Sequence, residues 1–413
     1  MEETVVVSKK DKVVKGKIDL TTSKSISNRA LLIQALAQNP FKIDNLAAAD
    51  DTVLMQRLLQ QIKAGNGGIV DAGPAGTVYR FLTALLSITP GTWTLTGSER
   101  MKQRPVKLLV DALRTLGADI KYLEQDGYPP ISVSGNSLKE NRVSIDGGVS
   151  SQYITALLLI APVLPNGLLL EIEGELASRP YVNMTLEMMR YFGAEVDFTG
   201  DTIVVKPKAY NGKDFKVEAD WSSASYWYLC AVLANEADIE LSGLYKESLQ
   251  GDAEIVDIMT CFGVETTYTS TGIRITKNSN FTKPVQFEWD FTHCPDLAQT
   301  VAVVCAASGI PSLLKGLHSL KIKETDRVAA LITELGKFDA NITESSFNVL
   351  SIQSSQLKQA TGVVNTYHDH RMALAFAPLA LLVPGVSIEN REVVGKSYPD
   401  YWNDLASVGF VIE

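Results

Sequence analysis

The chain has 413 residues, of which 46% are hydrophobic and 21% charged, and its formal net charge is −9. This length exceeds one ordinary hydrophobic core and predicts two domains, while the composition is that of a soluble globular protein. An acidic chain lacks the basic face that nucleic acid requires, so an anionic ligand must be met by a local cluster of basic residues. We therefore expect a small anionic ligand and no nucleic acid.

The remaining composition argues against membrane and metal-binding classes. The long apolar segments are interrupted by prolines and no signal peptide opens the chain, so we expect a cytoplasmic protein without a membrane segment. The four cysteines are dispersed without a Cys-x-x-Cys pair, which favours reduced thiols. His368 and His370 are the one candidate metal pair, but Arg371 adjoins them and no second His/Cys cluster exists, so we expect no metal.

Six apolar segments recur along the chain, and each opens with hydroxyl, glycine or charged residues. The opening stretches are 21–29, 75–80, 150–153, 222–226, 295–296 and 368–371. Because each following run is apolar nearly all round, the pattern predicts six buried helices. Free N–H groups and the positive end of the helix dipole bind anions, and Lys24 and Arg29 add charge to the first. The recurrence indicates one shared anion site; the alternative is ordinary N-capping beside solvated basic residues.

A second periodic feature divides the chain into units. Glycine follows an amphipathic stretch and precedes a strand-like segment at Gly117, Gly193, Gly263, Gly336 and Gly409. Glycine in this position ends a helix, and the 70–76-residue spacing predicts six repeats of an α/β architecture. We expect two domains of three repeats, 22–219 and 1–21 plus 220–413, with hinges near residues 21 and 220.

Basic residues also gather in four predicted loops between a strand and an amphipathic helix. They belong to the stretches 99–105, 178–181, 321–327 and 395–401. A charged run is usually a solvated surface, but these recur at the same place in successive repeats. Proline close after the basic residues in three of them is typical of shaped loops.

Nine motifs in this order resemble the 5-enolpyruvylshikimate-3-phosphate synthase family, across the whole chain. They are Ser-Lys-Ser-Ile-Ser-Asn-Arg (23–29), Ala-Gly-Thr (75–77) with Arg80, Arg-Met-Lys-Gln-Arg-Pro (100–105), Ser-Ser-Gln (150–152), Ser-Arg-Pro-Tyr (178–181), Pro-Asp (295–296), Lys-Glu-Thr-Asp-Arg (323–327), Asp-His-Arg (369–371) and Gly-Lys (395–396). The resemblance implies two domains, each of three βαβαββ units, that close on substrate.

The resemblance also implies the reaction and its ligands. The family transfers the enolpyruvyl group of phosphoenolpyruvate to the 5-hydroxyl of shikimate 3-phosphate in aromatic amino acid biosynthesis, without metal or organic cofactor. The residues implied for shikimate 3-phosphate are Ser25, Arg29, Ser150, Ser151, Gln152, Ser178, Tyr181, Asp296 and Lys323. Those implied for phosphoenolpyruvate are Lys24, Gly76, Thr77, Arg100, Gln152, Arg327, Arg371 and Lys396. We expect a monomer.

Two carboxylates lie inside motifs suited to the chemistry. The addition needs a base at the 5-hydroxyl and an acid at the methylene carbon of phosphoenolpyruvate, and Asp296 and Glu324 fit these roles, with Lys24 able to shuttle a proton. The alternative is that both carboxylates only balance the charge of the arginines.

The chain departs from the family pattern at three positions. Pro74 replaces an asparagine of the phosphoenolpyruvate loop, Ser319 stands where an asparagine often contacts the shikimate phosphate, and Arg179 replaces a common lysine. Because Gly76 carries no side chain, we expect sensitivity to glyphosate, an inhibitor of this family.

Two other interpretations compete with this one. The sister enolpyruvyl transferase that acts on UDP-N-acetylglucosamine usually has a reactive cysteine in the loop after the second repeat. This chain has Arg-Met-Lys (100–102) and no cysteine there, which argues against that activity. A non-catalytic anion-binding relative is the other alternative, and the retained Asp296 and Glu324 argue against it.

Overall fold

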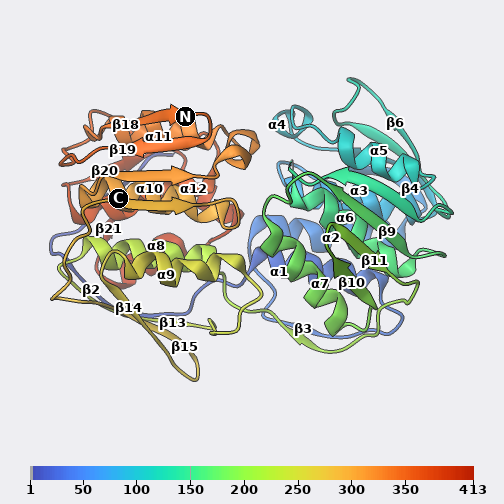
Figure 1. Cartoon of the computed structure of the whole chain (residues 1–413), viewed down its shortest axis with the longest axis horizontal. Coiled ribbons are helices and arrows are strands. Elements are labelled where there is room, and N and C mark those ends of the chain that lie inside the picture. The colour runs from blue at the N-terminus through green and yellow to red at the C-terminus, as the bar shows by residue number, and fades with distance from the viewer. Residues whose placement is uncertain (1–2, 149) are drawn as a thin grey trace. The chain divides into compact units, whose positions relative to one another are not determined.

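The structure is a computed structural model that describes residues 3–148 and 150–413. The chain forms two compact units (Figure 1). Unit 1 combines Met1–Ser23 with Glu218–Glu413, and unit 2 is Lys24–Val217. The chain thus passes between units at 23–24 and at 217–218, where the sequence analysis expected crossings near residues 21 and 220. That these stretches act as hinges stays a prediction.

The strands described in unit 2 form two four-stranded sheets and one short pair. They are β3 (Ile43–Asp44), β4 (Gly67–Asp71), β5 (Gly91–Thr96), β6 (Asp119–Tyr122), β7 (Ile131–Gly135), β8 (Arg142–Asp146), β9 (Leu168–Glu173), β10 (Val196–Thr199), β11 (Thr202–Val205) and β12 (Phe215–Lys216). The two sheets have the orders β4-β5-β7-β6 and β8-β9-β11-β10, each with one parallel pair followed by antiparallel neighbours. β3 and β12 form a parallel pair.

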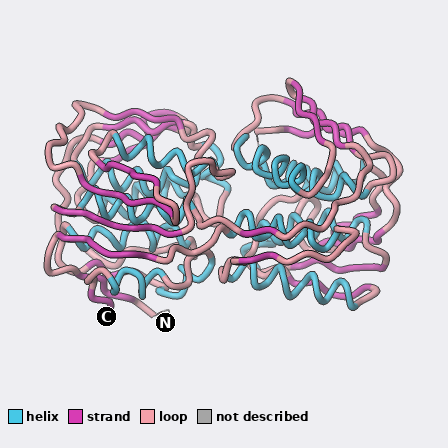
Figure 2. Tube along the Cα trace, turned by 90° about the horizontal axis from the view of Figure 1, so that it is seen from below, coloured by secondary structure: helices cyan, strands magenta, loops and turns pink. Residues whose placement is uncertain are grey.

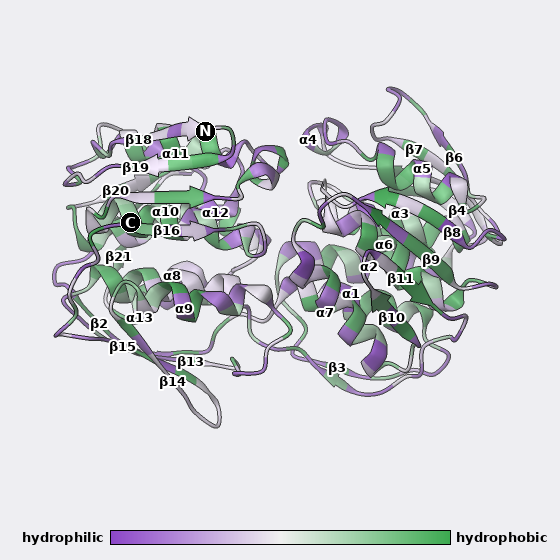
Figure 3. Ribbon diagram, in the orientation of Figure 1, coloured by the Kyte–Doolittle hydropathy of each residue, from purple (hydrophilic) through white to green (hydrophobic). Residues whose placement is uncertain are grey.

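The helices of unit 2 include three that form its centre. They are α1 (Lys24–Leu36), α2 (Asp50–Ala64), α3 (Gly76–Ile88), α4 (Glu99–Lys102), α5 (Lys107–Thr115), α6 (Ser151–Ile160), the 3₁₀ turn η1 (Ala161–Val163) and α7 (Arg179–Tyr191). α1, α3 and α6 pack against one another, and all of α6 except Gln152 is buried. Much of α3 and α6 is coloured hydrophobic in Figure 3. The prediction of apolar helices with polar N-termini is confirmed here.

Within its described residues, the strands of unit 1 form two four-stranded sheets and one three-stranded sheet. They are β1 (Val5–Ser8), β2 (Val13–Ile18), β13 (Glu236–Ser242), β14 (Val264–Tyr268), β15 (Gly272–Lys277), β16 (Phe287–Asp290), β17 (Ser312–Lys315), β18 (Ile342–Ser346), β19 (Val349–Ile352), β20 (Val386–Ile388) and β21 (Val411–Ile412). The sheet orders are β2-β13-β15-β14, β16-β17-β19-β18 and β20-β1-β21. β2, from the start of the chain, pairs in parallel with β13 in register Val13↔Glu236.

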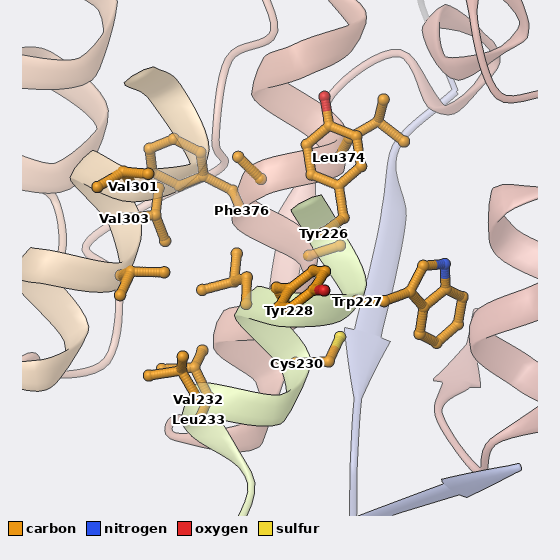
Figure 4. Packing of buried hydrophobic residues seen from close by; sticks show 14 of the residues in the cluster. Tyr226, Trp227, Tyr228, Cys230, Val232, Leu233, Val301, Val303, Leu374 and Phe376 are labelled. Atoms are coloured by element: carbon orange, nitrogen blue, oxygen red, sulfur yellow. The ribbon is translucent and has the colours of Figure 1, made fainter. Parts of the chain in front are cut away.

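Unit 1 also has three central helices. Its helical segments are α8 (Trp221–Leu233), η2 (Gly251–Glu254), α9 (Ile255–Thr260), η3 (Pro295–Leu297), α10 (Ala298–Ser308), η4 (His318–Ile322), α11 (Arg327–Gly336), α12 (His370–Phe376), η5 (Ala377–Leu381), η6 (Arg391–Lys396) and α13 (Tyr401–Ser407). α8, α10 and α12 pack together, and Figure 4 shows Tyr228, Val303 and Phe376 in their shared core. Only Ser222 of α8 is not buried.

The four four-stranded sheets share one topology. In three of them the strands and helices follow one another along the chain as βαβαββ, and in the fourth β2 takes the place of the first strand. In each unit strands and helices pack side by side, and some helices lie at the edge of the unit (Figure 2). The expected α/β class is confirmed. Among the described residues the other two sheets are smaller. In one of them β3 is only two residues long, and it is followed by Asn45, whose φ is 58°.

Glycine ends the amphipathic helices at four of the five predicted positions. Positive φ angles occur at Gly117 (103°), Gly193 (86°), Gly263 (79°) and Gly409 (90°). The predicted position after the helix end is wrong for Gly336, because Gly336 is the last residue of α11 and the left-handed residue that follows is Asp339, with φ 66°. Aspartate tolerates this conformation better than most residues, since its short side chain bonds locally.

Two further observations concern the whole chain. No helix within the described residues has both the length and the apolar character needed to cross a bilayer. The four cysteines are free thiols; Cys230, Cys294 and Cys305 are buried, while Cys261 is exposed.

Candidate functional site

Unit 2 gathers three of the predicted residues at the N-terminus of α3. Gln152, at the start of α6, donates from Nε2 to Thr77 Oγ1 at 3.0 Å, and its Oε1 accepts from Arg80 Nη1 at 2.6 Å. The Arg80 guanidinium also stacks over the Tyr153 ring at 5.2 Å. The first residue of α3 is Gly76, so its helix dipole points its positive end at this group. The arrangement is suited to binding an anion.

Arg104 is a residue of this group that the sequence analysis did not assign to a ligand. A Cβ atom at Gly76 would come within 2.5 Å of Arg104 Nη1 and 2.8 Å of Arg80 Nη1, so two guanidinium groups lie against the glycine. Arg104 is buried, at 7% exposed. The loop that carries it is anchored where Tyr153 Oη donates to the Pro105 carbonyl at 2.6 Å.

Arg100 is the cation of this loop that was predicted to bind phosphoenolpyruvate. Arg100 lies in the one-turn helix α4, is exposed, and donates to Gln103 Oε1 at 3.3 Å. Both arginines belong to the same motif, and only their burial distinguishes them. One feature of the sequence favours Arg104 over Arg100 as the ligand. Arg104 directly precedes Pro105, where the loop is anchored.

The N-terminus of α1 holds Lys24 and Ser25. Lys24 Nζ lies 3.2 Å from the Asp51 carboxylate, and the two side chains are 16% and 5% exposed. Ser25 is half-buried, and its backbone carbonyl accepts from Arg29 Nη1 at 2.8 Å. Lys24 therefore has a buried counter-charge in α2 that the motif analysis did not identify.

Arg29 ties the central helices together. Its Nε donates to Thr185 Oγ1 at 2.8 Å, and its Nη2 donates to Thr155 Oγ1 at 3.4 Å and to the Tyr181 carbonyl at 3.3 Å. Burial lowers the pKa of Arg29 to about 10. These bonds link α1 to α6 and α7, so Arg29 has a structural role in addition to the one expected of it.

The serine motifs of unit 2 cap helices. Ser150 caps α6, accepting from the Gln152 amide at 3.3 Å, and Ser151 is buried. Ser178 precedes α7 in the left-handed conformation, with φ 55°. That conformation is uncommon outside glycine and indicates a constrained turn. Tyr181 lies in the first turn of α7.

The three residues that depart from the family pattern lie in different environments. Pro74 is exposed in the turn before α3. The Arg179 guanidinium stacks over the Phe198 ring at 4.8 Å, a contact that lysine makes less well. Ser319 is buried in η4 of unit 1.

Unit 1 gathers a cluster of charged side chains around Asp296, at the start of the helical segment that continues as α10. Asp296 Oδ1 lies 3.0 Å from Arg327 Nη1, and Oδ2 lies 3.0 Å from Arg371 Nη2. Lys323 Nζ is 3.8 Å from Oδ1. Asp296 therefore lies between the two predicted arginines, which come from different segments of unit 1.

Glu324, like Asp296, accepts hydrogen bonds from two cationic side chains. Its Oε1 accepts from Lys396 Nζ at 3.0 Å and its Oε2 from Arg327 Nη2 at 3.1 Å. The structure thus brings together every unit 1 residue that the sequence analysis assigned to the site.

Arg327 is almost fully buried, at 2% exposed, and is held by a residue not assigned before. Asp369, 0% exposed, accepts from Arg327 Nε at 2.7 Å. Burial acts to lower the pKa of Arg327, but Asp369, Glu324 and Asp296 together raise it above its ordinary value. Arg327 therefore stays charged although it is buried. Burial lowers the pKa of Lys323, against the opposing effect of Asp296.

A second network reaches Arg371 from the other direction. Arg371 Nη1 donates to the Asp296 carbonyl at 3.3 Å and to Tyr226 Oη at 3.3 Å, and Nη2 donates to Ser222 Oγ at 3.4 Å. Ser222 Oγ in turn donates to Asp252. Burial, and then the charge of Asp296, raises the pKa of Asp252 well above its ordinary value.

The charges of the unit 1 cluster nearly balance. Among the described residues, four cations (Lys323, Arg327, Arg371 and Lys396) face three carboxylates (Asp296, Glu324 and Asp369), an excess of one positive charge in a chain of net charge −9. In the described part of the chain no three His, Cys, Asp or Glu side chains are grouped so as to hold a metal ion. The cluster is suited to a small polyanion.

The fold has close counterparts among solved structures. The EPSP synthase from Acinetobacter baumannii superposes with a TM-score of 0.79 at 20% sequence identity, covering 99% of each chain. Two α/β units with buried central helices, together with basic clusters at helix N-termini, define the chain as a protein with the enolpyruvyl transferase fold.

Sequence comparison identifies the particular family. The family model for EPSP synthase (3-phosphoshikimate 1-carboxyvinyltransferase) matches residues 8–405. The 3-phosphoshikimate 1-carboxyvinyltransferase of Bacteroides fragilis (strain YCH46) is 48% identical over 402 residues, 97% of each chain. That of Photobacterium profundum is 36% identical over 420 residues, 96% of each chain. The chain belongs to the EPSP synthase family of transferases.

Proposed function

We propose that this chain transfers the enolpyruvyl group of phosphoenolpyruvate to the 5-hydroxyl of shikimate 3-phosphate and releases phosphate. Family membership over residues 8–405 supports the reaction. The observation that carries the assignment to a site is the pair of arginines around Asp296, each 3.0 Å from one carboxylate oxygen. A general base flanked by two cations is what an anionic substrate with a reacting hydroxyl requires.

The two substrates are proposed to use residues of both units. Phosphoenolpyruvate is held by Lys24, Gly76, Thr77, Gln152, Arg327, Arg371 and Lys396. Shikimate 3-phosphate is held by Ser25, Arg29, Ser150, Ser151, Gln152, Ser178, Tyr181, Asp296 and Lys323. Arg104 is proposed in place of Arg100 as the cation beside Gly76, because Arg104 is buried against the glycine and Arg100 is exposed.

The reaction is proposed to proceed by addition and then elimination. Asp296 accepts the proton of the 5-hydroxyl while the hydroxyl oxygen bonds to C2 of phosphoenolpyruvate. Glu324 or Lys24 delivers a proton to C3. Loss of a C3 proton and cleavage of the C2–O bond to phosphate then restore the double bond. Fixing two substrates in reactive geometry lowers the barrier by roughly 7–11 kcal/mol.

The ion pairs of Asp296 and Glu324 bear on the alternative that they only balance charge. A carboxylate paired with an arginine can balance that charge without taking up a proton, and it can also act as a proton acceptor. The pairing is therefore compatible with either role, and kinetics of an Asp296 variant must decide between them.

The proposed roles divide the site residues between units 1 and 2, so we also propose that the stretches near residues 21 and 220 act as hinges. Shikimate 3-phosphate would then draw the two units together. We further propose that the enzyme acts in the cytoplasm as a monomer on small molecules, away from membranes and nucleic acid.

A phosphate-release assay with both substrates tests the function. We expect phosphate only when phosphoenolpyruvate and shikimate 3-phosphate are both present. Release with UDP-N-acetylglucosamine instead would indicate the sister transferase activity, and no release with any acceptor would indicate a non-catalytic relative. The variant Arg142→Ala, which loses an exposed ion pair with Glu171 on the β8–β9 sheet, serves as the control that should leave turnover unchanged.

A further inference from the structure

A buried carboxylate on α11 contacts the segment that leads to the charged cluster. Glu334 is 0% exposed. Its Oε2 accepts from the backbone N–H of Asn365 at 3.0 Å, and its Oε1 accepts from Tyr367 Oη at 2.7 Å. Lys337 Nζ, 2.7 Å away, supplies a counter-charge. A buried carboxylate with three donors is fully engaged, and two of its donors belong to one distant segment.

Glu334 and Arg327 hold the same segment from one helix face. They are seven residues apart in α11, which places them two turns apart on the same side. Glu334 holds Asn365 and Tyr367, while Arg327 Nε donates to Asp369 Oδ2 at 2.7 Å. The segment 365–369 is thus fixed at both ends by α11.

The segment between these contacts has an unfavourable backbone. Tyr367 and His368 have φ angles of 53° and 56°, two successive residues other than glycine in the left-handed region. Such residues persist only where surrounding contacts determine them. The next residue, Asp369, caps α12 by accepting from the Arg371 amide at 3.0 Å. The conformation of the turn therefore sets the position of both Asp369 and Arg371.

We propose that Glu334 is a positioning residue of the transferase, which holds the 367–368 turn so that Asp369 meets Arg327 and Arg371 meets Asp296. Glu334 bonds to Asn365 and Tyr367, which have no assigned substrate contact, and acts through the turn. The inference rests on the proposed role of Arg327 and Arg371 as phosphoenolpyruvate ligands. Its consequence is that removing a hydrogen bond between Glu334 and the turn should impair phosphoenolpyruvate binding in particular.

The test compares Tyr367→Phe with a matched tyrosine variant. Tyr367→Phe removes the hydroxyl that donates to Glu334 and keeps the aromatic ring. Tyr228→Phe removes a hydroxyl from the same unit, where Tyr228 Oη bonds Thr266 Oγ1 at 2.7 Å, far along the sequence from the turn. We expect Tyr367→Phe to raise the apparent KM for phosphoenolpyruvate about tenfold, since a hydrogen bond to a charged group is lost, with a smaller change for shikimate 3-phosphate. Tyr228→Phe should change neither.

A second measurement reports on the turn itself without using activity. Amide hydrogen exchange of peptides spanning 365–371 should be faster in Tyr367→Phe and in Glu334→Gln than in the wild type or Tyr228→Phe. Unchanged exchange there would overturn the proposal, as would equal rises of both KM values in Tyr367→Phe. If the wild type itself releases no phosphate, the proposed function fails, while the exchange data still decide whether Glu334 holds the turn.

Discussion

The Arg104 guanidinium lies directly against Gly76, so close that a Cβ atom on that residue would approach Nη1 to 2.5 Å. The absence of a side chain is therefore what lets two arginines, Arg80 and Arg104, reach the N-terminus of α3. A ligand anion at this helix end would meet backbone N–H groups and two guanidinium groups together.

Gly76→Ala should displace these arginines and weaken ligand binding at the loop. We expect the variant to lose affinity for glyphosate more than for phosphoenolpyruvate, because glyphosate is the longer of the two and fits a narrowed site less well. Competition kinetics measure both affinities at once. Equal weakening of the two would show that the loop does not discriminate by length.

Arg104→Ala and Arg100→Ala form a matched pair within one loop. Loss of a buried, charged hydrogen-bond donor costs about 1.5–3 kcal/mol, so Arg104→Ala should raise the apparent KM for phosphoenolpyruvate roughly 10- to 100-fold. Arg100 is exposed and its bond to Gln103 is long, at 3.3 Å, so its variant should stay close to wild type. Steady-state kinetics with varied phosphoenolpyruvate provide the comparison, and the reverse order of effects would restore Arg100 as the ligand.

Asp296→Asn separates a general base from a charge partner. The substitution keeps shape but removes the basic lone pair, so turnover should fall by roughly 10²–10⁴-fold if Asp296 accepts the hydroxyl proton. Shikimate 3-phosphate binding should weaken only modestly. Single-turnover kinetics at saturating substrates are the measurement, and a wild-type rate would remove Asp296 from the mechanism.

The buried Asp252 should make stability depend on pH. Its pKa is raised above the ordinary 3.8 by burial and by Asp296, so the folded chain holds this proton more tightly than the unfolded chain does. Stability should therefore decrease as pH rises from about 3.8 through the raised pKa. Asp252→Asn removes this dependence, and denaturant unfolding of both proteins between pH 4 and 8 should show their difference growing with pH. Asp220 also raises this pKa, while Arg371 and the hydrogen bond from Ser222 lower it, so a parallel pair of curves would contradict the net rise.

Shikimate 3-phosphate should make the protein more compact. If the stretches near residues 21 and 220 are hinges, adding this ligand should lower the radius of gyration measured by solution X-ray scattering. Phosphoenolpyruvate alone serves as the control. An identical scattering curve with and without shikimate 3-phosphate would argue strongly against the hinges.

Much of the fold was predictable because it depends on local periodicity. The segment 222–234 has almost no polar face, and α8 is accordingly buried except for Ser222. Gly117 and Gly193 end helices because glycine alone adopts their φ angles freely. Gly336 was expected to follow α11 but is its last residue, and Asp339 adopts the left-handed conformation instead.

The site was predictable in its motifs and less so in its individual residues. Arg327, Arg371 and Asp296 lie in separate motifs and do converge within unit 1. The choice between Arg100 and Arg104 depended on which one is buried against Gly76, and this is a tertiary contact. Glu334 was missed for a similar reason, because it contacts Tyr367, 33 residues further along the chain.

The pairing of β2 with β13 has a consequence for how the chain folds during synthesis. Val13 pairs with Glu236, so more than 200 residues must leave the ribosome before β2 meets its partner. At about 5–20 residues per second this takes on the order of ten to forty seconds. Unit 2 lies wholly within that interval and can fold while β2 is still unpaired. Chaperones that shield an exposed strand near a nascent N-terminus should therefore matter more for unit 1 than for unit 2.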